Sequence, residues 1–315
     1  MSATKVYAAR VKNGTTLAGS SSGGVFTAFT DVFLNRQEAV VCAVYNYEKK
    51  QTEFRIITDK TTRDSARGSK YMQSIPGNIF RETEEWLNAN KGKQLLFIGM
   101  GCQAAGLEKY AEIKGFRDRV TIMDIICHGS PSPLIWKEYA DELERRHKGR
   151  IEWLNFKDKR KGWLYPVALV RINNAEIFLD DYIKLFYSGC ILRPACHKCP
   201  YATVKRNVDI TIGDYWGVDR VRPDFFDRMG NSLVLLHTEK GEALFESCKE
   251  EMEYVESNIE DCLQPNLKAP TRVSNERTAF WQEYHKHGIN FITRKYGTVN
   301  VLQKLKSRWN RITVK

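Results

Sequence analysis

The chain has 315 residues, of which 42% are hydrophobic and 28% are charged, and its formal net charge is +11. This is the composition of an ordinary globular protein with one large or two moderate cores, and no window is apolar enough for a transmembrane helix. The first residues lack the apolar segment of a signal peptide, so we expect a cytoplasmic protein whose eight cysteines are thiols or metal ligands. The positive charge suits an anionic partner, but the dispersed basic residues form no nucleic-acid recognition module, which argues against nucleic acid.

A loop of serine and glycine precedes the first expected helix. It follows a short expected strand at residues 6–10 and leads directly into an apolar run with helical periodicity at residues 25–34. The loop consists of Ser20, Ser21, Ser22, Gly23 and Gly24. Backbone N–H groups and hydroxyls at a helix start can bind an anion, and small residues let a phosphate approach. Valine at both glycines is therefore expected to block phosphate binding without unfolding the protein. A flexible surface loop with a serine cap has the same pattern, and the residues alone favour neither interpretation.

A polar, basic segment occupies residues 66–74. It follows two expected strands at residues 38–45 and 54–58, and it precedes an expected helix at residues 79–88. Within the segment, Lys70 is a candidate to face a phosphate or a flavin ring, although a surface lysine is the default interpretation. Tyr71 is more often a packing residue than a stacking one.

Two apolar strands are expected at residues 94–98 and 120–126. Both have the continuous apolar character of strands in a buried parallel sheet. The first is followed by a turn that contains Cys102, and the second by Cys127. Because ligands collect at the carboxyl ends of strands in open α/β sheets, we expect these two thiols to meet at one edge of the sheet.

Three of the eight cysteines, Cys190, Cys196 and Cys199, lie within ten residues of one another. Two residues separate Cys196 from Cys199, which lets both sulfurs bind one metal centre from a single loop. Together with Cys102 and Cys127, this pair predicts a four-thiolate site, with Cys190 as the reserve ligand. Three merely buried or reduced thiols are the less favoured interpretation, since the loop also contains charged residues. The other three cysteines, Cys42, Cys248 and Cys262, are interpreted as structural.

The remaining elements complete an α/β fold class, with a mixed sheet, flanking helices, an antiparallel meander and C-terminal helices. The meander is expected at residues 151–156, 165–172 and 176–179, with a solvated charged turn at 157–162. A strand at 232–238, a helix at 241–254 and tail helices at 276–287 and 299–311 follow. We expect three soft divisions: residues 1–150 with the anion-binding motifs, 151–270 with the cysteine loop, and 271–315 as a helical extension.

Six motifs occur in a fixed order along the chain: SSSGGVFTAF, GSKYMQS, GMGCQAAGL, DIICHGSPSP, LRPACHKCPYA and DITIGDYWG. With these motifs the chain resembles the coenzyme F420 hydrogenase/dehydrogenase β subunits, a family of iron–sulfur flavoproteins. The resemblance implies an oxidoreductase that binds FAD and a 4Fe-4S cluster. It implies that the FAD phosphates lie on Ser20 to Gly24, with Ser69, Lys70, Tyr71 and Gln73 near the ring or ribose. The implied cluster ligands are Cys102, Cys127, Cys196 and Cys199.

The chain departs from many of these relatives because it has no cysteine before Cys42, where they carry a ferredoxin-like segment. We therefore expect an external electron carrier, either a ferredoxin-like protein or a deazaflavin coenzyme, and a small organic substrate. The docking surface is expected around Arg193, Lys198, Lys205 and Arg206. The family is diverse in substrate, and surface polysaccharide synthesis is one setting that the resemblance implies. The sequence leaves open whether the protein forms a homo-oligomer. The competing hypotheses are a non-redox accessory protein with a structural zinc–thiolate site and a flavoprotein that has lost its cluster.

Overall fold

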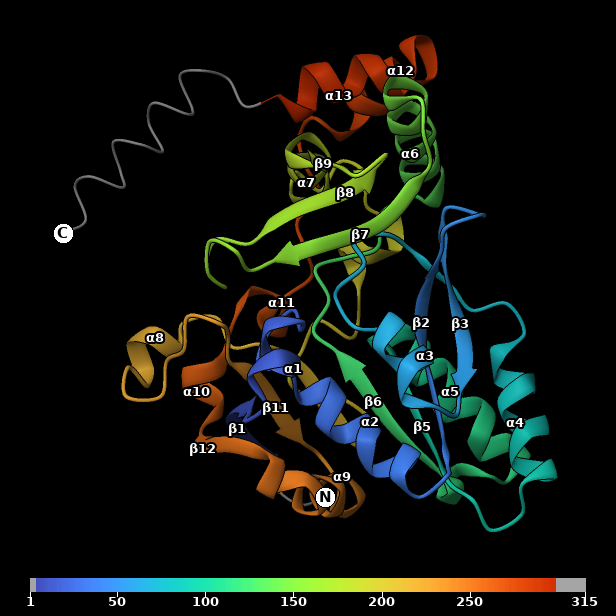
Figure 1. Ribbon diagram of the computed structural model, residues 1–315, viewed down its shortest axis with the longest axis vertical. Coiled ribbons are helices and arrows are strands. Elements are labelled where there is room, and N and C mark those ends of the chain that lie inside the picture. Colours follow the sequence, from blue (N-terminus) through green and yellow to red (C-terminus); the bar gives the residue numbers. More distant parts are fainter. Residues whose placement is uncertain (1–3, 299–315) are drawn as a thin grey trace.

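Figure 1 shows the computed structural model, which describes residues 4–298. Within these residues, nine strands form one mixed sheet in the order β12-β1-β11-β10-β6-β5-β2-β3-β4. The strands are β1 (Lys5–Val11), β2 (Ala39–Asn46), β3 (Gln51–Ile57), β4 (Ser74–Ile75), β5 (Leu95–Met100), β6 (Val120–Ile125), β10 (Ile210–Asp214), β11 (Ser232–Leu236) and β12 (Met252–Ser257). The predicted α/β class with a mixed sheet is confirmed.

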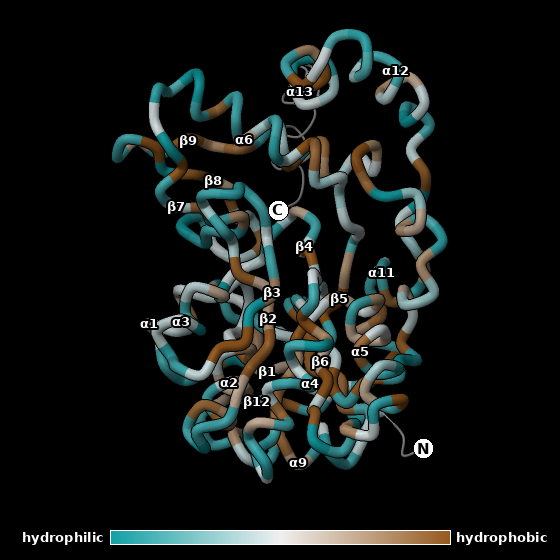
Figure 2. Tube along the Cα trace, turned by 90° about the vertical axis from the view of Figure 1, so that its right-hand side faces the viewer, coloured by the Kyte–Doolittle hydropathy of each residue, from teal (hydrophilic) through white to brown (hydrophobic). Residues whose placement is uncertain are grey.

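The centre of the sheet is parallel. Strand β5 pairs in parallel with β2 and β6, and β10 pairs in parallel with β6. Strands β5 and β6 are buried along almost their whole length, which explains their continuous apolar sequences. Figure 2 shows hydrophobic residues concentrated along these central strands.

Helices cover both faces of this sheet. On one face, α2 (Val25–Asn35) and α9 (Glu239–Cys248) pack over Leu96 and Ile98. On the other, α4 (Ile79–Ala89) and α5 (Gly101–Lys114) pack over Leu95 and Phe97. Successive β5 residues thus alternate between two cores, as the strand period of two requires.

A smaller three-stranded antiparallel sheet lies beside the large one (Figure 1), formed by β7 (Ile151–Asp158), β8 (Val167–Ile172) and β9 (Ala175–Phe178). The predicted meander is therefore confirmed. It shares a core with α6 (Pro133–His147), α7 (Asp180–Tyr187), α12 (Arg277–His287) and α13 (Ile289–Gly297). Helix α12 matches the first predicted tail helix, whereas the second, at residues 299–311, lies outside the described residues.

Short elements connect these parts. They are α1 (Gly14–Ala18), α3 (Lys60–Ser65), η1 (Arg117–Arg119), η2 (Pro194–Lys198), α8 (Val218–Val221), η3 (Lys249–Glu251), α10 (Ile259–Cys262) and α11 (Pro265–Lys268). No helix in residues 4–298 is long and apolar enough to cross a membrane.

One predicted helix is too long. The helix expected at residues 241–254 ends at Cys248, and the chain then enters β12, which pairs antiparallel with β1. Without β12, the backbone groups on this edge of β1 would have no partner. Pairing with them outweighs the helical pattern of the sequence.

The solvated turn predicted at residues 157–162 is wrong for two lysines, one at the end of β7 and one just after it. Lys157 and Lys159 are 2% and 6% exposed. The Lys159 ammonium donates to the carbonyl oxygens of Leu17 (2.6 Å), Ser22 (3.0 Å) and Met229. These three carbonyl oxygens replace the water molecules that would otherwise surround the charge. The Lys159 side chain can therefore be buried against the serine loop.

Gly23 and Gly24 pass tightly between two strands. The Val11 N–H donates to the Gly23 carbonyl at 2.8 Å. A Cβ atom on Gly23 would lie 2.3 Å from the Ala9 oxygen and 2.6 Å from the Ser232 nitrogen. Gly24 has φ of 83°, and its Cβ would lie 2.7 Å from the Val11 side chain. Both glycines are therefore required by the fold itself, and the expectation that valine there leaves the fold intact conflicts with this packing.

We expect Gly23→Ala to destabilise the protein by more than about 3 kcal/mol, because backbone atoms on both sides cannot yield to the new methyl group. Gly14→Ala is the matched control, since nothing lies within 4 Å of a Cβ placed there. Urea denaturation followed by circular dichroism measures both variants. Equal midpoints for the two would contradict the tight packing at Gly23.

Candidate functional site

A cavity of about 560 Å³ lies at the carboxyl ends of β5, β6 and β10. Segments that are distant in sequence meet around it: the serine loop with the start of α2, residues 66–72, the end of α7, and residues 264–266. Its volume is typical of a small-molecule or cofactor site. Its position matches the edge at which open α/β sheets bind ligands.

The serine loop and the 66–74 segment, predicted separately, form one wall of this cavity. The Ser69 N–H donates to Ser21 Oγ at 2.7 Å, although the two residues are 48 positions apart. Ser20 and Ser22 also line the cavity and donate to the carbonyl oxygens of Thr16 (2.6 Å) and Asn231 (2.8 Å). The N-terminus of α2 lies in the same wall, so its dipole favours an anion there.

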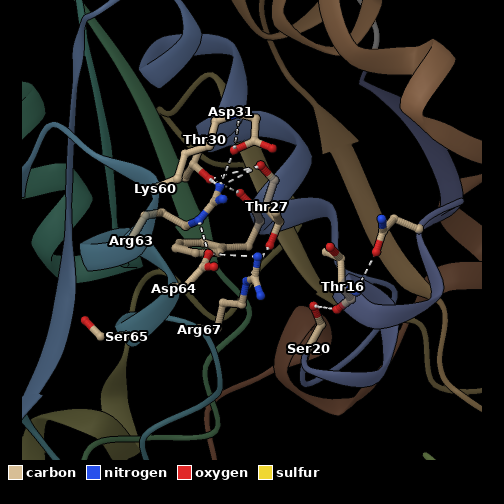
Figure 3. Close-up of polar contacts among 12 residues, drawn as sticks. Thr16, Ser20, Thr27, Thr30, Asp31, Lys60, Arg63, Asp64, Ser65 and Arg67 are labelled. Atoms are coloured by element: carbon tan, nitrogen blue, oxygen red, sulfur yellow. Dashed lines mark hydrogen bonds and ion pairs between the residues drawn. The ribbon is translucent and has the colours of Figure 1, made fainter.

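Two arginines fasten α3 and the 66–74 segment that follows it to α2 (Figure 3). Arg63, which is 2% exposed, donates to Asp31 at 2.7 Å and to the Thr27 carbonyl at 3.1 Å. Arg67 donates to Thr27 Oγ1 at 3.1 Å and pairs with Asp64. Arg67 also lines the cavity, which makes it a cationic candidate that the sequence analysis did not single out.

Lys70 lines the cavity, as an anion-binding role requires. Its ammonium donates to the carbonyl oxygens of Ala66 (2.6 Å), Gly68 (3.0 Å) and Arg67 (3.2 Å). Part of the residue faces the cavity, but protein surrounds the ammonium, and this burial lowers the pKa of Lys70 to about 8. A bound anion would favour the charged form.

Tyr71 also lines the cavity, whereas Gln73 does not. The Tyr71 ring stacks on Phe186, with centroids 4.6 Å apart and planes at 2°, so one of its faces is used in packing. Gln73 is not among the described residues that line the cavity. Gln103 lines the cavity instead. Its amide N–H donates to the Ser74 carbonyl at 2.9 Å, and its amide oxygen accepts from the Met100 N–H at 3.1 Å.

The structure brings Cys102, Cys127, Cys196 and Cys199 into one neighbourhood. Cys102 lies in the first turn of α5, Cys127 follows β6, and the other two lie in and after η2. Burial, with a smaller contribution from the charges of the other three thiols, raises the pKa of the Cys127 thiol to about 12. Cys102 is an exposed residue, yet partial burial of its thiol, and then the charges of Cys199 and Cys196, raise its pKa as well.

Cys190 is separate from this group. It is fully buried in the core around the small sheet, and its thiol donates to Ser274 Oγ at 3.3 Å. Its carbonyl oxygen accepts a bond from Trp281 Nε1 at 3.0 Å. These contacts give Cys190 a packing role in that core.

The four thiols do not converge on a point. In the described part of the chain, no three Cys, His, Asp or Glu side chains are placed to hold one metal ion. A 4Fe-4S cluster carries its iron atoms at four corners, so its ligands are spread around a volume instead of meeting at one atom. Four thiolates are a donor set that an iron–sulfur cluster can use, as a zinc ion can.

Two sets of contacts hold the cysteine loop in place. The Arg193 N–H donates to the Ser130 carbonyl at 2.8 Å, and the Ser132 N–H donates to the Ile191 carbonyl at 2.9 Å. Arg206 donates to Asp124 on β6 at 2.7 Å, with both side chains at most 3% exposed. Arg206 is thus unavailable for docking, which corrects that part of the prediction.

Asp214 and Trp216 also line the cavity, and the sequence analysis did not assign either of them. Asp214 accepts bonds from buried Lys157 (2.6 Å) and from Trp163 Nε1 (2.9 Å). Trp216 stacks on Trp163, with centroids 4.9 Å apart, and remains 39% exposed at the cavity. The GDYWG motif was visible in the sequence, but the burial of Lys157 beside it was not.

Comparison with known proteins agrees with this architecture. A family described as coenzyme F420 hydrogenase/dehydrogenase, beta subunit, matches the chain with its N-terminal part at residues 6–78 and its C-terminal part at residues 92–261. One subunit of the F(420)H(2) dehydrogenase of Methanosarcina mazei is 25% identical over 258 residues, which are 80% of this chain and 65% of that protein. The chain thus spans less than two thirds of that relative.

A chain of the F420-reducing [NiFe] hydrogenase complex from Methanosarcina barkeri has the same fold. The two superpose with a TM-score of 0.57 and 16% identity, covering 92% of this chain and 90% of that one. The two family matches together take in most of residues 6–261 and include the serine loop and all four clustered cysteines. The chain therefore belongs to the family of coenzyme F420 hydrogenase/dehydrogenase β subunits.

Proposed function

We propose that this member of an oxidoreductase family binds FAD in the cavity and a 4Fe-4S cluster on Cys102, Cys127, Cys196 and Cys199. The observation that carries the proposal is the position of Cys127, which lines the cavity and belongs to the group of four thiols. A cofactor in the cavity and a cluster on these thiols would share a wall. Electrons can then pass between them without crossing a thick layer of protein.

The serine loop, the start of α2, Arg67 and Lys70 would hold the FAD pyrophosphate. Hydroxyls, backbone N–H groups and two cations in one wall match the donors that a phosphate requires. When bound, the flavin supplies two-electron chemistry and the cluster supplies single-electron transfer. The chain's own residues orient the two groups and exclude water from the space between them.

We further propose an external electron carrier. The names of both relatives refer to coenzyme F420, which favours a deazaflavin coenzyme as one redox partner. Arg193, Lys198 and Lys205 are exposed beside the cysteine pair, which favours an acidic protein such as a ferredoxin as the other. The final substrate is proposed to be a small organic molecule, without a closer assignment.

Anaerobically purified protein is expected to be brown and to contain iron, sulfide and FAD. Changing Cys196 and Cys199 to Ser together should remove the iron and loosen the loop, because metal binding and folding are coupled. Cys248→Ala should keep the iron, since that thiol is buried against α9 carbonyls. Visible absorption and metal analysis measure both variants. A colourless zinc protein, or full iron occupancy in the double variant, would overturn the cluster assignment.

The pH dependence of FAD binding tests Lys70. Because its pKa is about 8 in the protein without FAD, the lysine is charged below pH 8 and loses its charge as the pH rises through that value. The affinity is therefore expected to be constant near neutral pH and to fall up to about tenfold per pH unit above pH 8. Isothermal titration of apoprotein with FAD measures this.

Lys70→Met should bind FAD about tenfold more weakly at pH 7 and show no further fall above pH 8. Lys60→Met, on the exposed surface of α3, is the control and should behave like the wild type. An unchanged pH profile in Lys70→Met would place the titrating group elsewhere.

Salt tests the docking surface. Reduction of the bound flavin by reduced ferredoxin should slow steeply as ionic strength rises, because the encounter is electrostatically steered. Lys198→Glu with Lys205→Glu should slow the reaction at low salt far more than at high salt, in stopped-flow measurements. Lys91→Glu, exposed at the opposite end of β5, should have little effect. Insensitivity to salt, with direct reduction by a deazaflavin, would replace the ferredoxin by the coenzyme.

A further inference from the structure

Three buried polar atoms of the described residues lie around the cysteine loop without a hydrogen-bond partner. They are His128 Nε2, Ser130 Oγ and His197 Nε2. Buried polar atoms in folded proteins are nearly always paired, so a group of three points to a ligand that the protein chain does not supply. The two histidines at least use their other ring nitrogen, which in each case contacts Thr271. The Ser130 hydroxyl has no partner at all within residues 4–298.

Ser130 is fixed beside Cys196. Its backbone N–H donates to Cys196 Sγ at 3.3 Å, and its carbonyl accepts from the Arg193 N–H at 2.8 Å. The preceding Gly129 has φ of 145°, and a Cβ there would lie 2.7 Å from Leu192, so the chain cannot shift aside. Ser130 itself is 6% exposed, which keeps its hydroxyl away from bulk water.

We propose that the Ser130 hydroxyl donates a hydrogen bond to the sulfur of the iron–sulfur centre on the Cys196 side and thereby raises its reduction potential. The inference rests on the proposed cluster. An added electron increases the negative charge on the cluster sulfurs, so a hydrogen-bond donor stabilises the reduced form more than the oxidised one. Because no described residue accepts a bond from the hydroxyl, it can rotate toward that sulfur without breaking one.

Ser130→Ala tests this on the full chain, reconstituted anaerobically with iron and sulfide. Potentiometric titration with dithionite, followed by electron paramagnetic resonance, should show a reduction equilibrium about tenfold less favourable than in the wild type. For a one-electron couple this is a fall of about 59 mV. Ser274→Ala is the matched control, because that serine contacts the non-ligand Cys190, and it should leave the potential unchanged.

Stability of the metal-free protein separates this role from a structural one. Removing an unpaired buried hydroxyl should leave the urea midpoint of the apoprotein equal or higher. A lower midpoint with an unchanged potential would make Ser130 a structural residue and overturn the inference. Wild-type protein that takes up no iron would instead overturn the proposed function.

If Ser130→Ala takes up no cluster, a second measurement on the wild-type protein tests the inference. In wild-type protein exchanged into D2O, electron–nuclear double resonance should show the loss of a proton coupling to the reduced cluster. The same loss is expected in Ser274→Ala, which keeps the Ser130 hydroxyl. If the Ser130 backbone N–H, which donates to Cys196 Sγ, gave the only exchangeable coupling, the inference would be overturned.

Discussion

The buried ion pair between Asp124 and Arg206 is the interaction on which the site depends. Neither charge could remain where it is without the other, because an unpaired charge in this interior would cost several kcal/mol. Thr211 donates to the second Asp124 oxygen at 2.6 Å, so both carboxylate oxygens accept a hydrogen bond. Burial raises the pKa of Asp124, and the arginine opposes that rise. The pair ties the end of the cysteine loop to the carboxyl end of β6, three residues before Cys127.

The cavity follows from the same parallel strands. Their carboxyl ends lie along one edge of the sheet, and segments from distant parts of the chain surround the cavity there. The serine loop and residues 66–72 close one side through the Ser21–Ser69 bonds. Lys159 supports this loop from behind, since its ammonium donates to the carbonyls of Leu17 and Ser22. A ligand here would contact the strand ends of the large sheet and the end of α7.

Part of the positive charge of this chain lies inside it. Lys70 and Lys159 are both held by backbone carbonyls, and burial lowers the pKa of each to about 8. Lys157 is neutralised by Asp214. Among the lysines and arginines of residues 4–298, Lys70 and Arg67 alone line the cavity, and Arg67 shares its charge with Asp64. This uneven distribution favours an anionic group at the serine-loop end of the cavity.

Local periodicity and spacing are enough to predict the central strands, the serine loop before α2 and the two pairs of cysteines. Continuous apolar runs predict buried parallel strands, and the carboxyl ends of such strands meet wherever the sheet forms. Other features depend on tertiary contacts. Arg206 and Lys159 have the sequence character of surface residues, but the structure buries them against Asp124 and against distant carbonyls. Cys190 is buried in the core around the small sheet, which the spacing of the cysteines does not predict. Strand β12 exists because β1 has an open edge. These outcomes depend on partners far away in the chain, which no local pattern specifies.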